Sequence, residues 1–148
     1  MTAALQSKMP APTPDLSGVE FATSADGLAV ARIGDLVLAM ADTAGHKRDL
    51  AKLNRVQTRM SASTPWGGSQ MAVVYAEGVV AHMTSGHGGF HLSSDRNAKV
   101  HPLLRKGTPW YEEDCEWAIV AISFPDLFTG YERSMAEKTF RNTWPDAW

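Results

Sequence analysis

The sequence predicts a single α+β domain, built from antiparallel β-hairpins or a meander with about three or four helices, and with a helical C-terminal part. Up to residue 92, short apolar runs alternate with glycine-containing pairs that are typical of tight hairpin turns. From Glu112 onward, acidic residues precede a nearly continuous apolar stretch that Pro125 ends, which is a helical pattern. Of the 148 residues, 44% are apolar, which is enough for one core, and no internal repeat divides the chain.

Residues 1–17 are predicted to form a flexible tail, because Pro10, Pro12 and Pro14 favour an extended chain that lacks hydrogen-bond donors for a sheet. The domain itself is predicted to span residues 18–148. Its first element is a three-stranded meander whose turns are an Asp-Gly and a Gly-Asp pair. The expected strands are Val19–Thr23, Leu28–Ile33 and Leu36–Ala41.

A basic amphipathic helix is predicted to follow, because Leu50, Leu53, Val56 and Met60 recur at helical spacing. Five basic residues and one acidic residue give the segment from Thr43 to the end of this helix a local charge of +4. A solvated helix face is the simplest interpretation, and a nucleic-acid-binding face is the alternative. The basic residues are Lys47, Arg48, Lys52, Arg55 and Arg59.

Further strands and helices are expected beyond a small-residue break at Ser61–Gly68. A Glu-Gly turn joins two apolar strands, a short third strand follows, and Ser93 or Ser94 is placed to cap a brief helix before Pro102. The C-terminal helices are expected to begin at Glu112 and Tyr131. The predicted strands are Met71–Ala76, Val79–Thr84 and Phe90–Leu92.

Composition excludes several classes of protein. Cys115 is the only cysteine, so no intrachain disulfide forms, and a reducing, cytoplasmic setting is expected. No apolar run is long enough to cross a membrane, and no secretory signal is expected. Residues 1–106 carry 11 basic and 8 acidic side chains (+3), whereas residues 107–148 carry 3 basic and 8 acidic ones (−5). Phosphate-binding loops, dinucleotide fingerprints and nucleophile elbows are absent from the sequence, and no cofactor is predicted.

From Thr64 to the end, the chain resembles an uncharacterised domain family of phages, plasmids and other bacterial mobile elements. The resemblance implies a mobile-element origin and supplies no activity. Residues 18–60, the expected meander and basic helix, lie outside it. The blocks that carry the resemblance are Thr64-Pro65-Trp66-Gly67, Tyr75 with Gly78-Val79, Thr84, His87-Gly88-Gly89-Phe90-His91-Leu92-Ser93, Trp110-Tyr111-Glu112-Glu113-Asp114, Phe124-Pro125 and Pro145-Asp146-Ala147-Trp148.

The His-Gly-Gly segment is the first candidate for chemistry. Glycines around His87 allow a close approach of the backbone to a ligand, and successive N–H groups can form an anion-binding nest. His87 would then act as a general acid or base. The alternative is a hairpin loop in which Gly88 and Gly89 serve only the turn.

Paired carboxylates at Glu112, Glu113 and Asp114 are the second candidate. They suit acid–base chemistry, with Glu113 or Asp114 acting together with His87 in an enzyme. Negative charge at the start of a helix is the structural alternative. The sequence does not show whether this segment meets the His-Gly-Gly loop, and their meeting would favour an enzyme.

A metal site is the third candidate and a weak one. His82, His87 and His91 lie within ten residues, with His101 and Cys115 further along. Their spacing matches no common zinc pattern.

Surplus aromatic residues suggest a surface that binds a partner, since tryptophan and tyrosine dominate interface hot spots. The candidate binding residues are Trp66, Gly88, Gly89, Trp110, Tyr111, Glu112 and Trp148.

Together these features predict an accessory protein of a mobile element that acts by protein–protein interaction, and an enzyme is disfavoured. The expected partner is a host protein within a nucleic-acid-processing defence complex, so the protein would be a counter-defence inhibitor, such as an anti-CRISPR or anti-restriction protein. One alternative is a small hydrolase or nuclease that uses His87 with Glu113 or Asp114, with or without a metal. Another alternative is a nucleic-acid-binding accessory protein. Self-association is left open.

Overall fold

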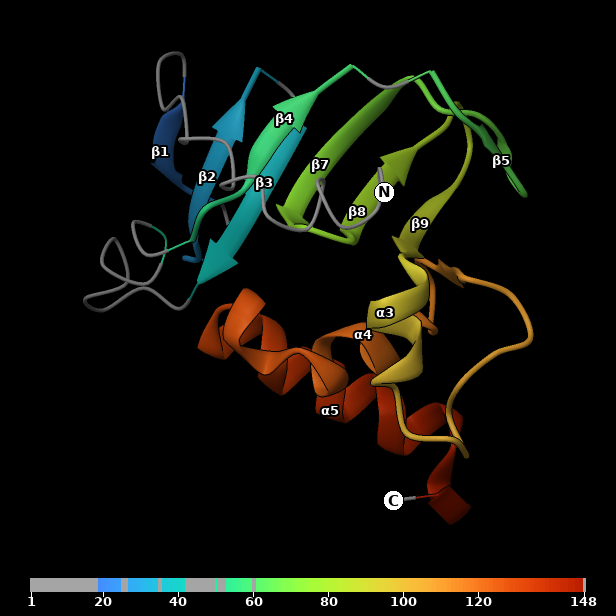
Figure 1. The fold of residues 1–148 in the computed structure, drawn as a ribbon. Coiled ribbons are helices and arrows are strands. Elements are labelled where there is room, and N and C mark those ends of the chain that lie inside the picture. The colour runs from blue at the N-terminus through green and yellow to red at the C-terminus, as the bar shows by residue number, and fades with distance from the viewer. Residues whose placement is uncertain are drawn as a thin grey trace.

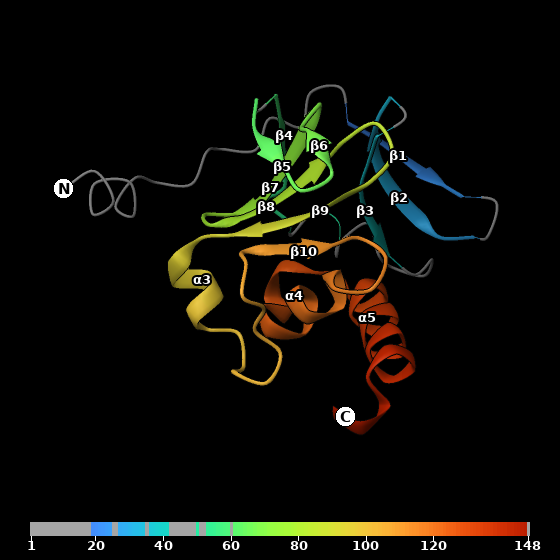
Figure 2. The same ribbon diagram turned by 90° about the vertical axis from the view of Figure 1, so that its right-hand side faces the viewer.

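The described part of the fold consists of a three-stranded and a five-stranded antiparallel sheet, a small two-stranded sheet, and a layer of helices below them (Figures 1 and 2). The computed structural model describes residues 19–24, 27–34, 36–41, 50, 53–59 and 61–147. This architecture confirms the predicted α+β class. The tail 1–17, the basic residues Lys47, Arg48 and Lys52, and Trp148 lie outside the described residues.

The three-stranded sheet is the predicted meander. Its strands are β1 (Glu20–Thr23), β2 (Ala29–Ile33) and β3 (Leu36–Ala41), in that spatial order. Gly27 and Gly34 adopt φ angles of 83° and 57°, which side-chain-bearing residues rarely adopt, and this explains the glycines in the two turns. The sheet packs its alanine-rich side onto Val73 of the second sheet.

The five-stranded sheet has the order β10-β9-β8-β7-β4. Its strands are β4 (Val56–Thr58), β7 (Met71–Ala76), β8 (Val79–Met83), β9 (Gly88–Leu92) and β10 (Trp110–Glu112). Pairing of Ala81 with Phe90, and of Phe90 with Tyr111, places these three residues on the inner face, toward the helices. Alternation puts His82, His91 and Trp110 on the outer face. The break at Ser61–Gly68 contains the small hairpin β5 (Ser63–Thr64) and β6 (Gly67–Gly68).

The helices cover the inner face, and their ends follow the local sequence. Ser93 caps α3 (Ser94–Ala98) by accepting a hydrogen bond from the backbone of Arg96, as predicted. Helix α4 (Trp117–Ser123) is largely buried, and η1 (Pro125–Leu127) follows it. A capping box of Thr129 and Glu132 begins α5 (Gly130–Thr143), which confirms the predicted last helix. The short η2 (Pro145–Ala147) comes after it.

Two helix predictions were wrong. Val56–Thr58, predicted as the end of the basic helix, is strand β4 and pairs with β7. Its β-branched Val56 and Thr58 suit a strand, and sheet pairing outweighs a short helical pattern. The helix expected to start at Glu112 begins only at Trp117. Residues 110–112 instead form the edge strand β10, where the Glu112 N–H donates to the carboxylate of Glu116 at 3.0 Å.

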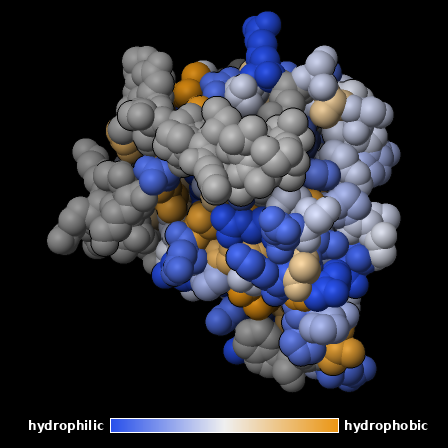
Figure 3. All heavy atoms as spheres, in the orientation of Figure 1, coloured by the Kyte–Doolittle hydropathy of each residue, from blue (hydrophilic) through white to orange (hydrophobic). Residues whose placement is uncertain are grey.

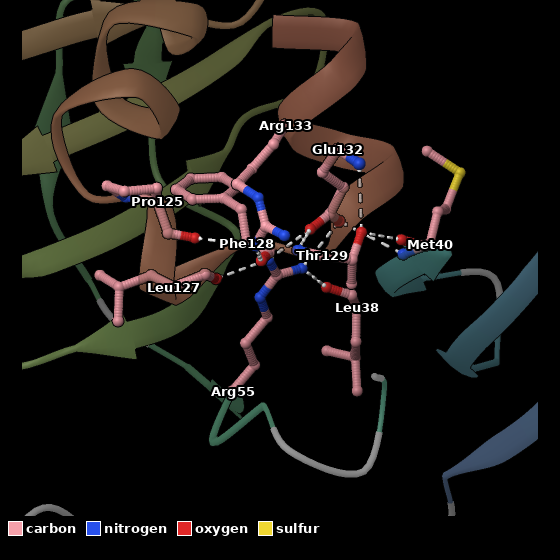
Figure 4. Close-up of polar contacts among 9 residues, drawn as sticks. All are labelled: Leu38, Met40, Arg55, Pro125, Leu127, Phe128, Thr129, Glu132 and Arg133. Atoms are coloured by element: carbon pink, nitrogen blue, oxygen red, sulfur yellow. Dashed lines mark hydrogen bonds and ion pairs between the residues drawn. The ribbon is translucent and has the colours of Figure 1, made fainter. Parts of the chain in front are cut away.

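A buried ion pair, which we call the clasp, joins the three-stranded sheet to α5 (Figure 4). The Arg55 guanidinium donates to both carboxylate oxygens of Glu132, at 2.7 and 3.0 Å, and to the backbone oxygens of Leu38 and Leu127. Glu132 also accepts from the Met40 N–H at 3.2 Å. Side chains thus bond the outward backbone oxygen of Leu38 and the N–H of Met40, on the open edge of β3.

None of the described helices is long and apolar enough to span a membrane.

Candidate functional site

A cleft of about 370 Å³ lies where the two sheets meet the helices, and we call it the junction cleft. Strand β3 contributes Val37 and Met40, and the helical layer contributes Trp117, Phe128 and Glu132. The five-stranded sheet supplies most of the lining: Val73, Tyr75, Ala81, His82, Met83, Gly89 and Phe90. Glu113 completes it. The volume falls within the range of ligand-binding clefts, and the lining is predominantly apolar, as such clefts usually are.

The mouth of the cleft is marked by its exposed lining residues. Val37 is 47% exposed, and the Glu113 side chain is 50% exposed. His87 approaches Glu113, with 3.9 Å between Nδ1 and Oε1, and its own side chain is 60% exposed. The Glu113 N–H donates to the oxygen of Gly88 at 3.0 Å, so pairing of β9 with β10 brings the two segments together. The loop and the acidic segment therefore converge at the cleft, although an exposed pair at this distance is a weak interaction.

Packing accounts for the glycines of the His-Gly-Gly segment. A Cβ on Gly89 would clash with the Trp66 ring and with the backbone oxygen of Tyr111. A Cβ on Gly88 would lie 2.6 Å from the backbone oxygen of His82. No residue from 85 to 89 has a positive φ, whereas a nest needs the left-handed conformation. Residues 85–89 therefore lack the conformation of the anion-binding nest considered as one of two interpretations, and Gly88 and Gly89 are strand residues.

The acidic mouth consists of Glu112, the last residue of β10, with Glu113 and Asp114 in the turn that follows. The Asp114 N–H donates to Oε1 of Glu112 at 3.2 Å. Partial burial raises the pKa of the Glu112 carboxyl, and the neighbouring Asp114 side chain raises it further. Glu116, by contrast, is paired with Lys106 at 2.6 Å. Negative charge therefore gathers at the mouth, where the His87 side chain approaches Glu113.

On the outer face, two histidines and two tryptophans form a packed cluster. The Trp110 ring lies 5.7 Å from the Trp66 ring, 4.6 Å from His91 and 5.6 Å from His82, measured between centroids. The Ser69 hydroxyl lies 2.8 Å from Nδ1 of His82. Burial lowers the pKa of both imidazoles, and the proximity of His91 lowers that of His82 further. This packing explains why Trp66 and Trp110 are only partly exposed.

The metal hypothesis gains no support from this arrangement. His82 and His91 lie on the outer face and pack on Trp110, whereas His87 lies in the loop beside Glu113. In the part of the chain that the structure describes, no three His, Cys, Asp or Glu side chains are grouped so that they could hold a metal ion. Cys115 is half-buried in the turn before α4.

The basic residues proposed for nucleic-acid binding do not form one described face. Arg55 is 6% exposed and held by Glu132, so it is unavailable to a phosphate. Arg59 is exposed. The other three lie outside the described residues, as stated above.

A second cleft of about 330 Å³ opens between the end of β7 and η1. Its lining contains two basic residues, Arg55 and Arg96, and two acidic residues, Glu77 and Asp126. On the face of the molecule seen in Figure 1, the surface view in Figure 3 shows hydrophobic side chains among hydrophilic ones where the sheets meet the helices.

Residues at the mouth of the junction cleft were predictable from the sequence as candidates, whereas the residues of its body were not. Met40, Met83, Phe90 and Phe128 look like ordinary core residues in the sequence, and only the tertiary fold leaves space between them. Glu132 did carry a signal, because Thr129 and Glu132 have the spacing of a capping box. That signal indicates the start of a helix and does not predict that Glu132 pairs with Arg55.

The fold and the junction cleft define a small α+β protein with a ligand-sized cleft between its sheets and helices. Residues 59–148 match the model of the family described as Domain of unknown function (DUF7007), so the chain belongs to this family. The predicted membership of an uncharacterised domain family is thereby confirmed. Strands β1 to β4 precede the matched region. No curated protein and no solved structure matches the chain.

Proposed function

We propose that this protein acts by binding a partner protein at the junction cleft and its acidic mouth, without turning over a substrate. The observation that carries the proposal is the contrast between an apolar cleft, which Glu113 lines, and the exposed carboxylates of Glu113 and of Asp114 next to it in the sequence. Apolar contact supplies affinity in protein interfaces, and charge at the rim steers association. The two other charged side chains near the cleft, Arg55 and Glu132, already form an ion pair with each other.

We infer further that the partner is a host defence complex that processes nucleic acid, and that the protein serves a mobile element there. The resemblance of the sequence blocks to mobile-element proteins is what suggests this context, and the charge of −5 over residues 107–148 supports a basic partner surface. In its concrete form, the proposal is a counter-defence inhibitor of a CRISPR effector or a restriction nuclease.

The experiment is a plating assay in hosts that carry one such system each. Expression of the wild-type protein should raise the plating efficiency of a targeted phage by about tenfold or more in one of these hosts. Glu113→Lys with Asp114→Lys should abolish that protection, since it reverses the charge of the mouth. Glu77→Lys with Asp95→Lys is the matched control, because both residues are exposed acids outside the cleft lining. Absence of protection in every host, or equal loss in the control, would contradict the proposal.

One observation favours a second function, a small hydrolase or nuclease. His87 Nδ1 and Glu113 Oε1 lie 3.9 Å apart beside the cleft. This is longer than a hydrogen bond, so the pair would have to close to about 3 Å for Glu113 to orient His87 as a general base. In that case, His87→Ala should abolish the turnover of an ester or nucleic-acid substrate while the fold is kept. If purified wild-type protein shows no turnover above the level of His87→Ala, this alternative fails.

A further inference from the structure

We propose that the junction cleft receives an extended peptide segment of the partner, with a large apolar side chain in the cleft and a lysine or arginine beside it at the acidic mouth. This inference rests on the proposed function and names the chemistry of the partner segment.

The body of the cleft accepts an apolar group because its polar members are directed elsewhere. Glu132 is bound by Arg55, Met40 and Thr129 through its carboxylate. His82 lies on the outer face of the sheet, with its imidazole beside Ser69. The surface that remains consists of aliphatic, aromatic and thioether side chains, and contact with it removes apolar area of the partner from water.

Two methionines favour a side chain of a protein as the occupant. Met40 and Met83 face the cleft from different sheets. Methionine is flexible and polarisable, so methionine-lined surfaces adapt to apolar side chains of different shapes. Phe90 and Phe128 add an aromatic floor, and their rings are 5.9 Å apart.

The negative charge of the mouth determines which kind of partner residue lies beside the apolar side chain in the cleft. Glu113 and Asp114 are exposed at the mouth, and Glu112 is half-exposed next to them. A lysine or arginine of the partner would meet these carboxylates, whereas an acidic residue would be repelled. Val37, which lines the cleft from β3 and is 47% exposed, extends the apolar surface toward solvent and suits a segment that continues beyond the cleft.

The test is a titration of the full chain with a synthetic peptide in which one leucine stands between two lysines in a glycine–serine background. Binding is followed by the NMR signals of ¹³C-labelled methionine methyl groups. We expect the signals of Met40 and Met83 to shift, and that of Met135, which is exposed on α5, to stay. Replacing the leucine by serine, or both lysines by glutamate, should weaken binding by about tenfold or more.

Two matched pairs of variants locate the site. Val37→Lys and Glu113→Lys should each weaken binding of the lysine–leucine–lysine peptide by about tenfold. Leu103→Lys and Glu77→Lys are their controls, because Leu103 is 86% exposed and neither residue lines the cleft. All four residues are exposed or at the edge of the cleft, so the variants should fold.

Each outcome has one meaning. Equal affinity for the three peptides, shifts outside Met40 and Met83, or equal losses in the controls would overturn the inference. If the plating assay shows protection that depends on Glu113 and Asp114 but the peptide does not bind, the inference fails and the proposed function stands. If the plating assay shows no protection but the peptide binds specifically at the cleft, the proposed function fails and the peptide-binding site stands.

Discussion

The clasp and the acidic mouth are both charged regions at the junction of the two sheets and the helices, and they differ in how their charges are satisfied. At the clasp, Arg55 and Glu132 are buried and bonded to each other and to the backbone. At the mouth, His87 and Glu113 are exposed and 3.9 Å apart. Breaking a buried pair strands a charge away from water, whereas exposed charges remain solvated. The clasp therefore holds the fold, and the mouth is free for a partner.

The largest expected effect is that of Glu132→Ala. Removing this carboxylate leaves the Arg55 guanidinium buried without its partner, so the free energy of unfolding should fall by about 3–5 kcal/mol. Urea denaturation measures it, with Glu137→Ala on the exposed side of α5 as the control. A loss of under about 1 kcal/mol would show that the clasp is not structural.

A smaller effect is expected at the glycines next to the mouth. Gly89→Ala introduces a Cβ that meets the Trp66 ring and the Tyr111 backbone, and it should cost about 1–3 kcal/mol of stability. Gly86→Ala is the matched control, because nothing lies within 4 Å of its Cβ and its φ is not positive. Thermal unfolding of the two variants compares them. If Gly86→Ala costs as much as Gly89→Ala, the packing explanation is wrong.

The pH dependence of stability should reveal the buried imidazole of His82. Burial lowers its pKa in the folded state, so the unfolded chain takes up the proton first as the pH falls through about 6.5. The contribution of the neutral His82 imidazole to the free energy of unfolding is present at higher pH. It is lost as the pH falls toward the lower pKa of the folded state. We expect His82→Gln to flatten the decline in unfolding free energy between about pH 7.5 and about pH 5.5. An unchanged decline would refute this assignment.

The smallest effect on stability belongs to the mouth itself. Glu113→Gln removes only an exposed, loosely paired charge, so the free energy of unfolding should change by less than about 0.5 kcal/mol. Urea denaturation beside Glu132→Ala gives the comparison directly. A change that approaches the Glu132→Ala value would make the mouth a second structural pair.

Much of this fold was predictable from local sequence because its cues are local. Gly27, Gly34 and Gly78 mark turns with positive φ, and Ser93 caps the helix for which it was predicted. Strands β4 and β10 were missed because each has three residues and exists only through pairing with a neighbour. The partnership of Arg55 with Glu132 spans 77 positions, which no local pattern encodes.

The same distinction applies to the candidate site. His87 and Glu113 were identified by residue type, and their convergence follows from pairing of β9 with β10. Residues of the cleft body, such as Met40 and Phe128, come from elements that are far apart in sequence, so only the packed fold shows them as one surface.

The most direct test of the contrast between clasp and mouth is the methionine-methyl NMR titration of the variant Glu113→Lys with Asp114→Lys. We predict that the free variant keeps the Met40 and Met83 signals of the wild type, and that the lysine–leucine–lysine peptide no longer shifts them. Loss of the dispersed methionine methyl signals in the free variant would show that the residues of the mouth are needed for folding. Peptide shifts equal to those of the wild type would show that the mouth does not bind the segment.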